Sequence, residues 1–268
     1  MLLEDCKGGE SITTMLLAID VGNTHTTFGV FQDEILLADW RVSTSSRRTG
    51  DEWGYILKEL IEEEDIKKNQ VMQVAISCVV PPVLNTLQGL FERRWRIPLL
   101  VTGPGIRTGL SIRAEAKETG ADRIVNAVAA AHLYGGDLVI VDFGTATTFC
   151  ALTANREYLG GAIAPGIGIS QEALYEKTAK LPRIDVEIPE RCIGRNTIEA
   201  MHSGIFYGYI GLCREIVATM KKEFAPGARV AATGGWGIFL HNFCDFIDYF
   251  NPVLTLEGLR IINELNKK

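Results

Sequence analysis

The stretch Met15–Val30, which reads MLLAIDVGNTHTTFGV, decides how the rest of the chain is interpreted. Apolar residues lead into Asp20, Gly22 follows at once, and a hydroxyl-rich segment then alternates with apolar residues. This pattern predicts a strand, a tight glycine turn and a second, antiparallel strand. We therefore expect a β-hairpin that presents a carboxylate where its first strand ends.

A hairpin of this composition suits a phosphate group. Gly22 lets the backbone approach an anion closely, and the hydroxyls of Thr24, Thr26 and Thr27 can donate hydrogen bonds to it, as can the backbone amides. Asp20 can hold a hydrated divalent cation.

The same pattern occurs a second time, at residues 138–150, which read LVIVDFGTATTFC. Asp142 and Gly144 repeat the spacing of Asp20 and Gly22, about half a chain further on. Two such copies predict two similar lobes, each presenting an acidic hairpin to a shared cleft. Strands and helices alternate after the first hairpin, so we expect an α/β fold with a mixed sheet.

Composition narrows the classes of protein. The chain has 268 residues, of which 47% are hydrophobic, and this is enough for one large core or two modest ones. A net charge of −6 argues against nucleic-acid binding, which depends on clustered Lys and Arg. No apolar run approaches the roughly 20 residues of a membrane helix. Six cysteines without paired spacing suggest reduced, largely buried thiols, and hence a cytoplasmic protein.

One glycine-rich segment, TGPGIRTG at 102–109, partly matches the motif of a dinucleotide-binding loop. Thr108 stands where the third glycine of that motif should be, and no helical pattern opens at the glycines. We therefore expect a turn-rich connection here.

The sequence GADR at 120–123 opens a strongly helical segment. Taken alone, an acid in a first helical turn is best explained by its favourable interaction with the helix dipole. Gly120 and Arg123 change this interpretation, because glycine clears space for a ligand and arginine can hold an anion. Asp122 is therefore a candidate for a reaction centre.

A long helix is predicted from Ile198 to Lys222, after the sequence GRNT at 194–197. Its glycines at 204, 208 and 211 share one face. Such a stripe suits close helix packing, either within the fold or between subunits.

Several motifs together resemble the type III pantothenate kinase family, from Met15 to near the C-terminus. They are DVGNT at 20–24, GADR at 120–123, DFGTATT at 142–148, GGAIAPG at 160–166, GRNT at 194–197 and ATGG at 232–235. The resemblance implies the fold of the acetate kinase, sugar kinase, Hsp70 and actin superfamily, in which two ribonuclease-H-like lobes enclose a nucleotide cleft. We expect an extension at 1–14 that is disordered, and lobes at 15–118 and 119–268.

The family phosphorylates pantothenate with ATP to give 4'-phosphopantothenate, the first step of coenzyme A biosynthesis. The resemblance further implies Mg²⁺, a monovalent cation (K⁺ or NH₄⁺), a homodimer, a cytoplasmic location, and no nucleic-acid or membrane partner. It assigns the ATP contacts to Asp20, Val21, Gly22, Asn23, Thr24, His25, Thr26, Thr27 and Thr145.

By the same resemblance, Asp142 binds the monovalent cation. Pantothenate contacts Gly120, Ala121, Asp122 and Arg123, together with Thr197 of the partner subunit. Asp122 is implied to be the general base that takes the proton from the primary hydroxyl of pantothenate. These implied roles agree with the chemistry of phosphoryl transfer. The reaction requires mainly positioning and charge neutralisation, and a carboxylate at the acceptor hydroxyl can take its proton.

One segment departs from the family pattern. Family members usually carry a tyrosine and an Asn-Pro pair shortly before GADR, whereas this chain reads AEAKET at 114–119. Loss of the tyrosine predicts weaker pantothenate binding, and Arg113 or Lys117 is expected to replace the lost contact.

Two rival functions stay open. One is a non-catalytic regulatory protein of the same fold, like the Bvg accessory factors; the other is an acid-cluster phosphohydrolase that releases phosphate from ATP without pantothenate. Asp20, Asp122 and Asp142 favour the kinase over the accessory protein, because a protein that only binds has little need for an acid at the transfer point.

Overall fold

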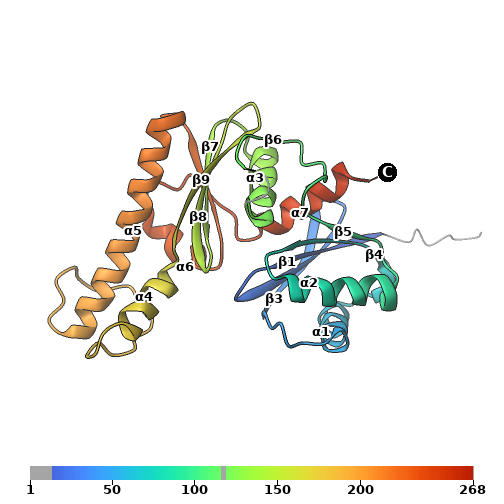
Figure 1. Ribbon diagram of the computed structural model, residues 1–268, viewed down its shortest axis with the longest axis horizontal. Helices are drawn as coiled ribbons and strands as arrows, with labels where there is room; N and C mark the ends of the chain where they lie inside the picture. The colour runs from blue at the N-terminus through green and yellow to red at the C-terminus, as the bar shows by residue number, and fades with distance from the viewer. Residues whose placement is uncertain (1–13, 116–118, 268) are drawn as a thin grey trace, which may run out of the picture. The chain divides into compact units, whose positions relative to one another are not determined.

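The computed structural model describes residues 14–115 and 119–267 (Figure 1). The chain divides between Val101 and Thr102 into two compact units. The sequence analysis set the boundary at 118/119 instead; the short strand β6 (Ser111–Ile112) pairs with a strand of the second unit, so this segment belongs to that sheet. Of the extension expected at 1–14, all but Thr14 lies outside the described residues.

The first unit contains a five-stranded mixed sheet in the order β3-β2-β1-β4-β5. Its strands are β1 (Met15–Val21), β2 (His25–Gln32), β3 (Ile35–Ser43), β4 (Val71–Cys78) and β5 (Leu99–Val101). The first three form an antiparallel meander, whereas β4 runs parallel to β1 and β5 parallel to β4. The predicted hairpin and mixed sheet are therefore confirmed.

Three helices and a short turn complete this unit. They are α1 (Gly50–Glu63), η1 (Lys68–Gln70), α2 (Pro81–Gln88) and the π-helical η2 (Gly89–Trp95). Thr49 starts α1 because its hydroxyl accepts from the amide of Glu52, whose carboxylate accepts in return from the Thr49 amide. Residues Leu17 and Ile19 of β1 pack with the buried faces of α1 and α2 in one apolar cluster.

The second unit contains a six-stranded sheet in the order β11-β10-β7-β8-β9-β6. Besides β6, its strands are β7 (Leu138–Phe143), β8 (Ala146–Leu152), β9 (Glu157–Pro165), β10 (Arg229–Thr233) and β11 (Tyr249–Phe250). Without β6, the order repeats that of the first unit: an antiparallel meander of three strands, with two parallel strands added on the side of the first. The prediction of two similar lobes is thus confirmed at the level of sheet topology.

Helices cover both faces of this second sheet (Figure 1). They are α3 (Ala121–Leu133), α4 (Ile167–Glu176), α5 (Thr197–Phe224), α6 (Gly237–Leu240), η3 (His241–Phe243) and α7 (Leu254–Leu265). Side chains alternate along β7: Val139 and Val141 pack in a cluster with α5, whereas Leu138 and Ile140 pack with α3. This alternation fixes which face Asp142 occupies.

The glycine stripe of α5 does not serve packing within the described chain. A side chain atom added to Gly204, Gly208 or Gly211 would meet no heavy atom of the described residues within 4 Å. The alternative of close packing inside the fold was therefore wrong, and packing between subunits stays a prediction.

Three further features can be compared with the sequence. The segment at 102–109 forms neither helix nor strand, as expected for a turn-rich connection. Among the described cysteines, Cys150, Cys213 and Cys244 are buried and Cys192 is exposed, and all are free thiols. No helix in the described part of the chain is long and apolar enough to span a membrane.

Gly161 offers a direct test of the sheet of the second unit. A side chain atom at this position of β9 would overlap the backbone of Phe149 on β8. We expect Gly161→Ala to lower the free energy of unfolding by about 1–3 kcal/mol, the usual cost of overpacking. Denaturant titration followed by circular dichroism would measure this change.

The matched control is Gly89→Ala. Gly89 has helical backbone angles (φ −58°, ψ −38°) and open space around the added atom. This substitution should leave stability unchanged or raise it by about 0.4–1 kcal/mol. Equal stability of the two variants would contradict the close approach of β8 and β9.

Candidate functional site

The first acidic hairpin places Asp20 at the penultimate position of β1. Asp20 lies opposite Thr27 on β2 and opposite Ser77 on β4. The amide of Gly22 donates to the carbonyl of His25 at 3.0 Å and closes the turn. A side chain atom on Gly22 would lie 3.1 Å from the same carbonyl oxygen, so glycine suits this tight turn.

Thr44 braces the turn from the end of β3. Its hydroxyl donates to the carbonyl of Gly22 at 2.8 Å, and its amide donates to the carbonyl of Thr24 at 2.9 Å. The hydroxyl of Thr26 is buried and lies 2.9 Å from that of Thr44. Thr26 thus supports the turn from inside, and Thr44 is a contributor that the sequence analysis missed.

The other predicted phosphate contacts differ in access. Asn23, Thr24 and His25 are exposed, and Thr27 is half-buried, whereas the side chain of Val21 is fully buried in the core. Any contact of Val21 with a ligand must therefore come from its backbone.

Ser77 lies beside Asp20 on the neighbouring strand. Its hydroxyl is buried and makes no hydrogen bond to the described residues. A buried polar atom of this kind is normally satisfied by water or a ligand atom. This residue was also missed, because a serine inside an apolar strand carries no signal of its own.

The ring of His25 interacts with a cation. Nδ1 of His25 lies 3.0 Å from Nη2 of Arg41. The guanidinium of arginine stays protonated in proteins, so Nη2 can only donate a hydrogen bond. Although His25 is largely exposed, partial desolvation of its ring, and secondly the charge of Arg41, lower its pKa below the usual 6.5. The lowered pKa favours the neutral ring, and the neighbouring guanidinium favours the tautomer in which Nδ1 is the acceptor.

The second hairpin repeats this geometry. Asp142 is the penultimate residue of β7 and lies opposite Thr148 on β8 and Thr233 on β10. Gly234 follows β10 with φ of +94°, and a side chain atom there would come within 2.5 Å of Oδ1 of Asp142. The glycine is needed both for its backbone angle and to leave room at this carboxylate oxygen.

Thr145 occupies the exposed turn between β7 and β8. Its carbonyl accepts a hydrogen bond from the amide of Gly166 at 3.2 Å. A side chain on Gly166 would overlap the carbonyl oxygens of Thr145 and Gly144. The glycine that ends the motif at 160–166 thus packs directly on the hairpin turn.

Helix α3 begins at the predicted GADR motif. Gly120 precedes its first turn, and a side chain on Gly120 would overlap Oδ1 of Asp122. The same oxygen accepts from the amide of Arg123 at 2.8 Å. Gly120, Ala121, Asp122 and Arg123 are all half-buried.

Helix α3 is joined to the second hairpin by Asn126. Its Nδ2 donates to Oδ2 of Asp142 at 3.0 Å. Asn126 follows Asp122 by four residues, so it lies one turn further along the same helix face, a rise of about 5–6 Å. The structure thus brings Asp122 and Asp142 into one region, and Asn126 is a contact that the sequence analysis missed.

Thr197 lies elsewhere in the second unit, at the start of α5. Asn196 caps this helix by accepting from the amide of Glu199 at 2.9 Å, and a side chain on Gly194 would overlap the backbone of Glu199 and Ala200. The GRNT motif therefore has a local structural explanation. Thr197 itself is exposed and lines a groove between α4 and α5.

The altered segment before GADR is partly described. The guanidinium of Arg113 pairs with the carboxylate of Glu157 on β9, with Nε 2.9 Å from Oε1. In this structure, Arg113 therefore has a partner other than a ligand. Lys117, the second expected replacement for the lost tyrosine, lies outside the described residues.

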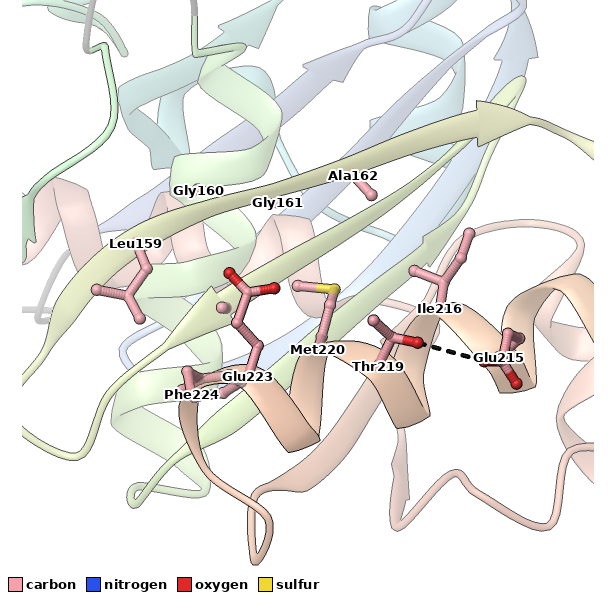
Figure 2. A pocket seen from close by; sticks show the side chains of 11 residues that line it. Leu159, Gly160, Gly161, Ala162, Glu215, Ile216, Thr219, Met220, Glu223 and Phe224 are labelled. Atoms are coloured by element: carbon pink, nitrogen blue, oxygen red, sulfur yellow. Dashed lines mark hydrogen bonds between the residues drawn. The ribbon is translucent and has the colours of Figure 1, made fainter.

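A further groove of about 430 Å³ lies between β9 and the C-terminal half of α5 (Figure 2). Met220 and Ile216 form part of its apolar wall, and the side chain of Glu223 projects from α5 towards β9 (Figure 2). None of the predicted site residues lines it. This groove is thus separate from the two acidic hairpins.

The protonation of His25 is testable by nuclear magnetic resonance. We expect its ring to titrate with a midpoint below 6.5, and Arg41→Gln to raise that midpoint only partway, because burial is the larger cause. Since the folded-state pKa is lowered, stability from neutral His25 is present above about pH 6.5 and is lost as the pH falls through the folded-state pKa. His25→Gln identifies the signal, and a midpoint above 6.5 would contradict the environment described.

Solved structures with similar folds have low sequence identity to this chain. A protein from Campylobacter jejuni described as a Baf family transcriptional activator matches with a TM-score of 0.58 and 21% identity, over 93% of this chain and 98% of that one. An inorganic polyphosphate/ATP-glucomannokinase from an Arthrobacter strain matches with a TM-score of 0.51 and 13% identity, over 95% of this chain and 100% of that one. These likenesses show a shared two-lobed α/β fold.

The family comparison is more specific. The model of the type III pantothenate kinase family matches residues 16–219. The matched range includes both acidic hairpins, the start of α3 and the start of α5. Because it spans well over half of the sequence, the chain belongs to the type III pantothenate kinase family.

Proposed function

We propose that this protein phosphorylates pantothenate with ATP to give 4'-phosphopantothenate. The observation that carries the proposal is the geometry around α3. A carboxylate in its first turn, Asp122, lies one helical turn from Asn126, which bonds the acid of the second hairpin, Asp142. Membership of a kinase family supports the same reaction.

In this proposal, the first hairpin binds the phosphates of ATP. Asn23, Thr24 and His25 are exposed beside the Gly22 turn, and Asp20 lies at the end of β1. No group of three or more His, Cys, Asp or Glu side chains suited to a metal ion occurs among the described residues. Mg²⁺ commonly takes one or two carboxylates and completes its shell with water and phosphate oxygens, so Asp20 fits such a site.

The second hairpin would contact the nucleotide through Thr145 and hold a monovalent cation, K⁺ or NH₄⁺, at Asp142. The donor chemistry fits this group: a carboxylate is a suitable oxygen ligand, Asn126 holds its Oδ2, and glycine at 234 avoids a side chain against Oδ1. A bound cation would supply positive charge beside the phosphates.

The start of α3 would bind pantothenate. Arg123 provides a cation for its carboxylate, and Gly120 and Ala121 allow close approach of the ligand. Asp122 would accept the proton of the primary hydroxyl while that oxygen forms its bond to the γ-phosphorus. The bond from the γ-phosphorus to the bridging oxygen breaks, and ADP leaves.

An accessory protein without catalysis is the second candidate. Its support is the fold shared with the Campylobacter jejuni protein described as a transcriptional activator. A coupled assay of ADP release with and without pantothenate separates the possibilities. Release that requires pantothenate supports the kinase, release without it supports a phosphohydrolase, and no release with intact ATP binding supports the accessory protein.

The role of Asp122 can be tested by substitution. Asp122→Asn keeps the shape of the side chain and removes its ability to take a proton. We expect the turnover number to fall by roughly 10²–10⁴-fold, the usual contribution of a positioned base. Steady-state kinetics would measure the fall, with ATP binding followed separately by calorimetry.

A suitable control is Asp39→Asn, which changes an exposed aspartate on β3 in the same way. Its turnover should equal that of the native protein. An unchanged rate in Asp122→Asn would reject the role of general base.

A homodimer is the second expectation to test. Exposed glycines of α5 and apolar side chains such as Leu174 and Leu212 line the groove of about 630 Å³ between α4 and α5, next to Thr197. Such a face suits close helix packing with a second copy. We expect light scattering to show a dimer and Gly208→Arg to shift it to the monomer.

The matched control is Gly227→Arg, since Gly227 is also exposed with open space around it but lies after α5. This variant should remain dimeric. A native protein that is monomeric at micromolar concentration and fully active would overturn the expectation.

A further inference from the structure

Asn126 is a polar residue in an apolar part of α3. It is only 1% exposed and lies between the buried residues Val125 and Ala127. A buried amide without hydrogen-bond partners would be costly. Both ends of this amide are satisfied by side chains: Nδ2 donates to Oδ2 of Asp142 at 3.0 Å, and Oδ1 accepts from the hydroxyl of Thr255 at 2.7 Å.

The chemistry of the partners fixes the orientation of this amide. An ionised carboxylate only accepts hydrogen bonds, so the amide nitrogen must face Asp142. The amide oxygen then faces Thr255, whose hydroxyl can donate to it. Thr255 therefore holds Asn126 in the one orientation that serves the carboxylate.

Helix α7 can reach Asn126 because of a glycine. A side chain on Gly258 would overlap the carbonyl oxygen of Val125, the residue that precedes Asn126. Gly258 follows Thr255 by three residues and lies on the neighbouring turn of the same helix. The close approach of the two helices thus brings the hydroxyl of Thr255 within reach of the amide.

We propose that Asn126, held by Thr255, is a positioning residue that orients Asp142 for binding of the monovalent cation. This inference rests on the proposed function. Asn126 fixes Oδ2 of the carboxylate, while Oδ1 lies towards Gly144 and Gly234, with 3.6 Å and 2.5 Å to side chain atoms added there. A side chain at Gly234 would crowd this oxygen, whereas one at Gly144 would make only ordinary contact with it.

The neutrality of the amide matters for this role. A lysine or arginine in place of Asn126 would orient the carboxylate equally well but would also neutralise it. The amide donates a hydrogen bond to Oδ2 of Asp142 without bringing a positive charge of its own. Partners that orient a metal ligand in this way typically contribute 10–100-fold to metal affinity.

The test uses substitutions that keep the volume of the side chain. Thr255→Val removes the hydroxyl and preserves the shape, whereas Thr255→Ser keeps the hydroxyl. Thr219→Val makes the same exchange on the exposed face of α5 and serves as the control. Asn126→Ala removes the amide itself.

Two measurements are made on each variant of the full chain. The first is the concentration of KCl that half-activates pantothenate-dependent ADP release, at constant ionic strength maintained with choline chloride. The second is the concentration of KCl that half-maximally raises the melting temperature in the presence of ADP and Mg²⁺, which involves no turnover.

We expect Asn126→Ala to raise both KCl concentrations about 10–100-fold, and Thr255→Val to raise them about tenfold, the lower end of that range. In Thr255→Val, the turnover number at saturating KCl should stay close to that of the native protein. Thr255→Ser and Thr219→Val should match the native protein in both measurements.

Equal KCl dependence of Thr255→Val, Asn126→Ala and the native protein would overturn the inference and leave the kinase assignment intact. Absence of any effect of KCl on the native protein in both measurements would overturn it as well. Absence of pantothenate-dependent ADP release in the native protein would reject the proposed function instead. The melting measurement would then still decide whether Asn126 and Thr255 set the affinity of Asp142 for a cation.

Discussion

The structure depends on one constraint: the strand that carries each acid is paired on both sides. β1 lies between β2 and β4, and β7 lies between β8 and β10. The register of each of these strands is therefore fixed by hydrogen bonds to both neighbouring strands. A slip of one residue would move each acid to the opposite face of the sheet, among the apolar side chains. Because Val141 and Phe143 must face α5, Asp142 must face the side of the sheet that α3 covers.

Local features of the fold could be predicted from sequence because their signals are local. Alternation and a glycine turn specified both hairpins, and the change to helical spacing after Gly120 specified α3 within a residue or two. The positions of Asp20 and Asp142 at strand ends followed directly. The sequence gives no such signal for β6 and β11, which have two residues each and exist only because a neighbouring strand supplies their hydrogen bonds.

Long-range contacts of the candidate site could not be predicted in this way. Thr255 is 129 residues from Asn126, and Thr44 is 22 residues from the Gly22 carbonyl that it bonds. Nothing in the apolar segment around Asn126 indicates which partner an amide there will find. The partner of Asn126 is determined by the position of α7 against α3. That position depends on the absence of a side chain at Gly258.

The same reasoning explains how acids in this fold can be held in place without losing their function. Asp142 accepts from the amide of Asn126, and Asp122 accepts from the backbone amide of Arg123 at the positive end of α3. Both of these donors are neutral amides, so they orient the carboxylates without bringing a positive charge of their own. Orientation of Asp142 by a side-chain amide and of Asp122 by a backbone amide therefore suits both proposed roles, because each carboxylate is held in a defined position.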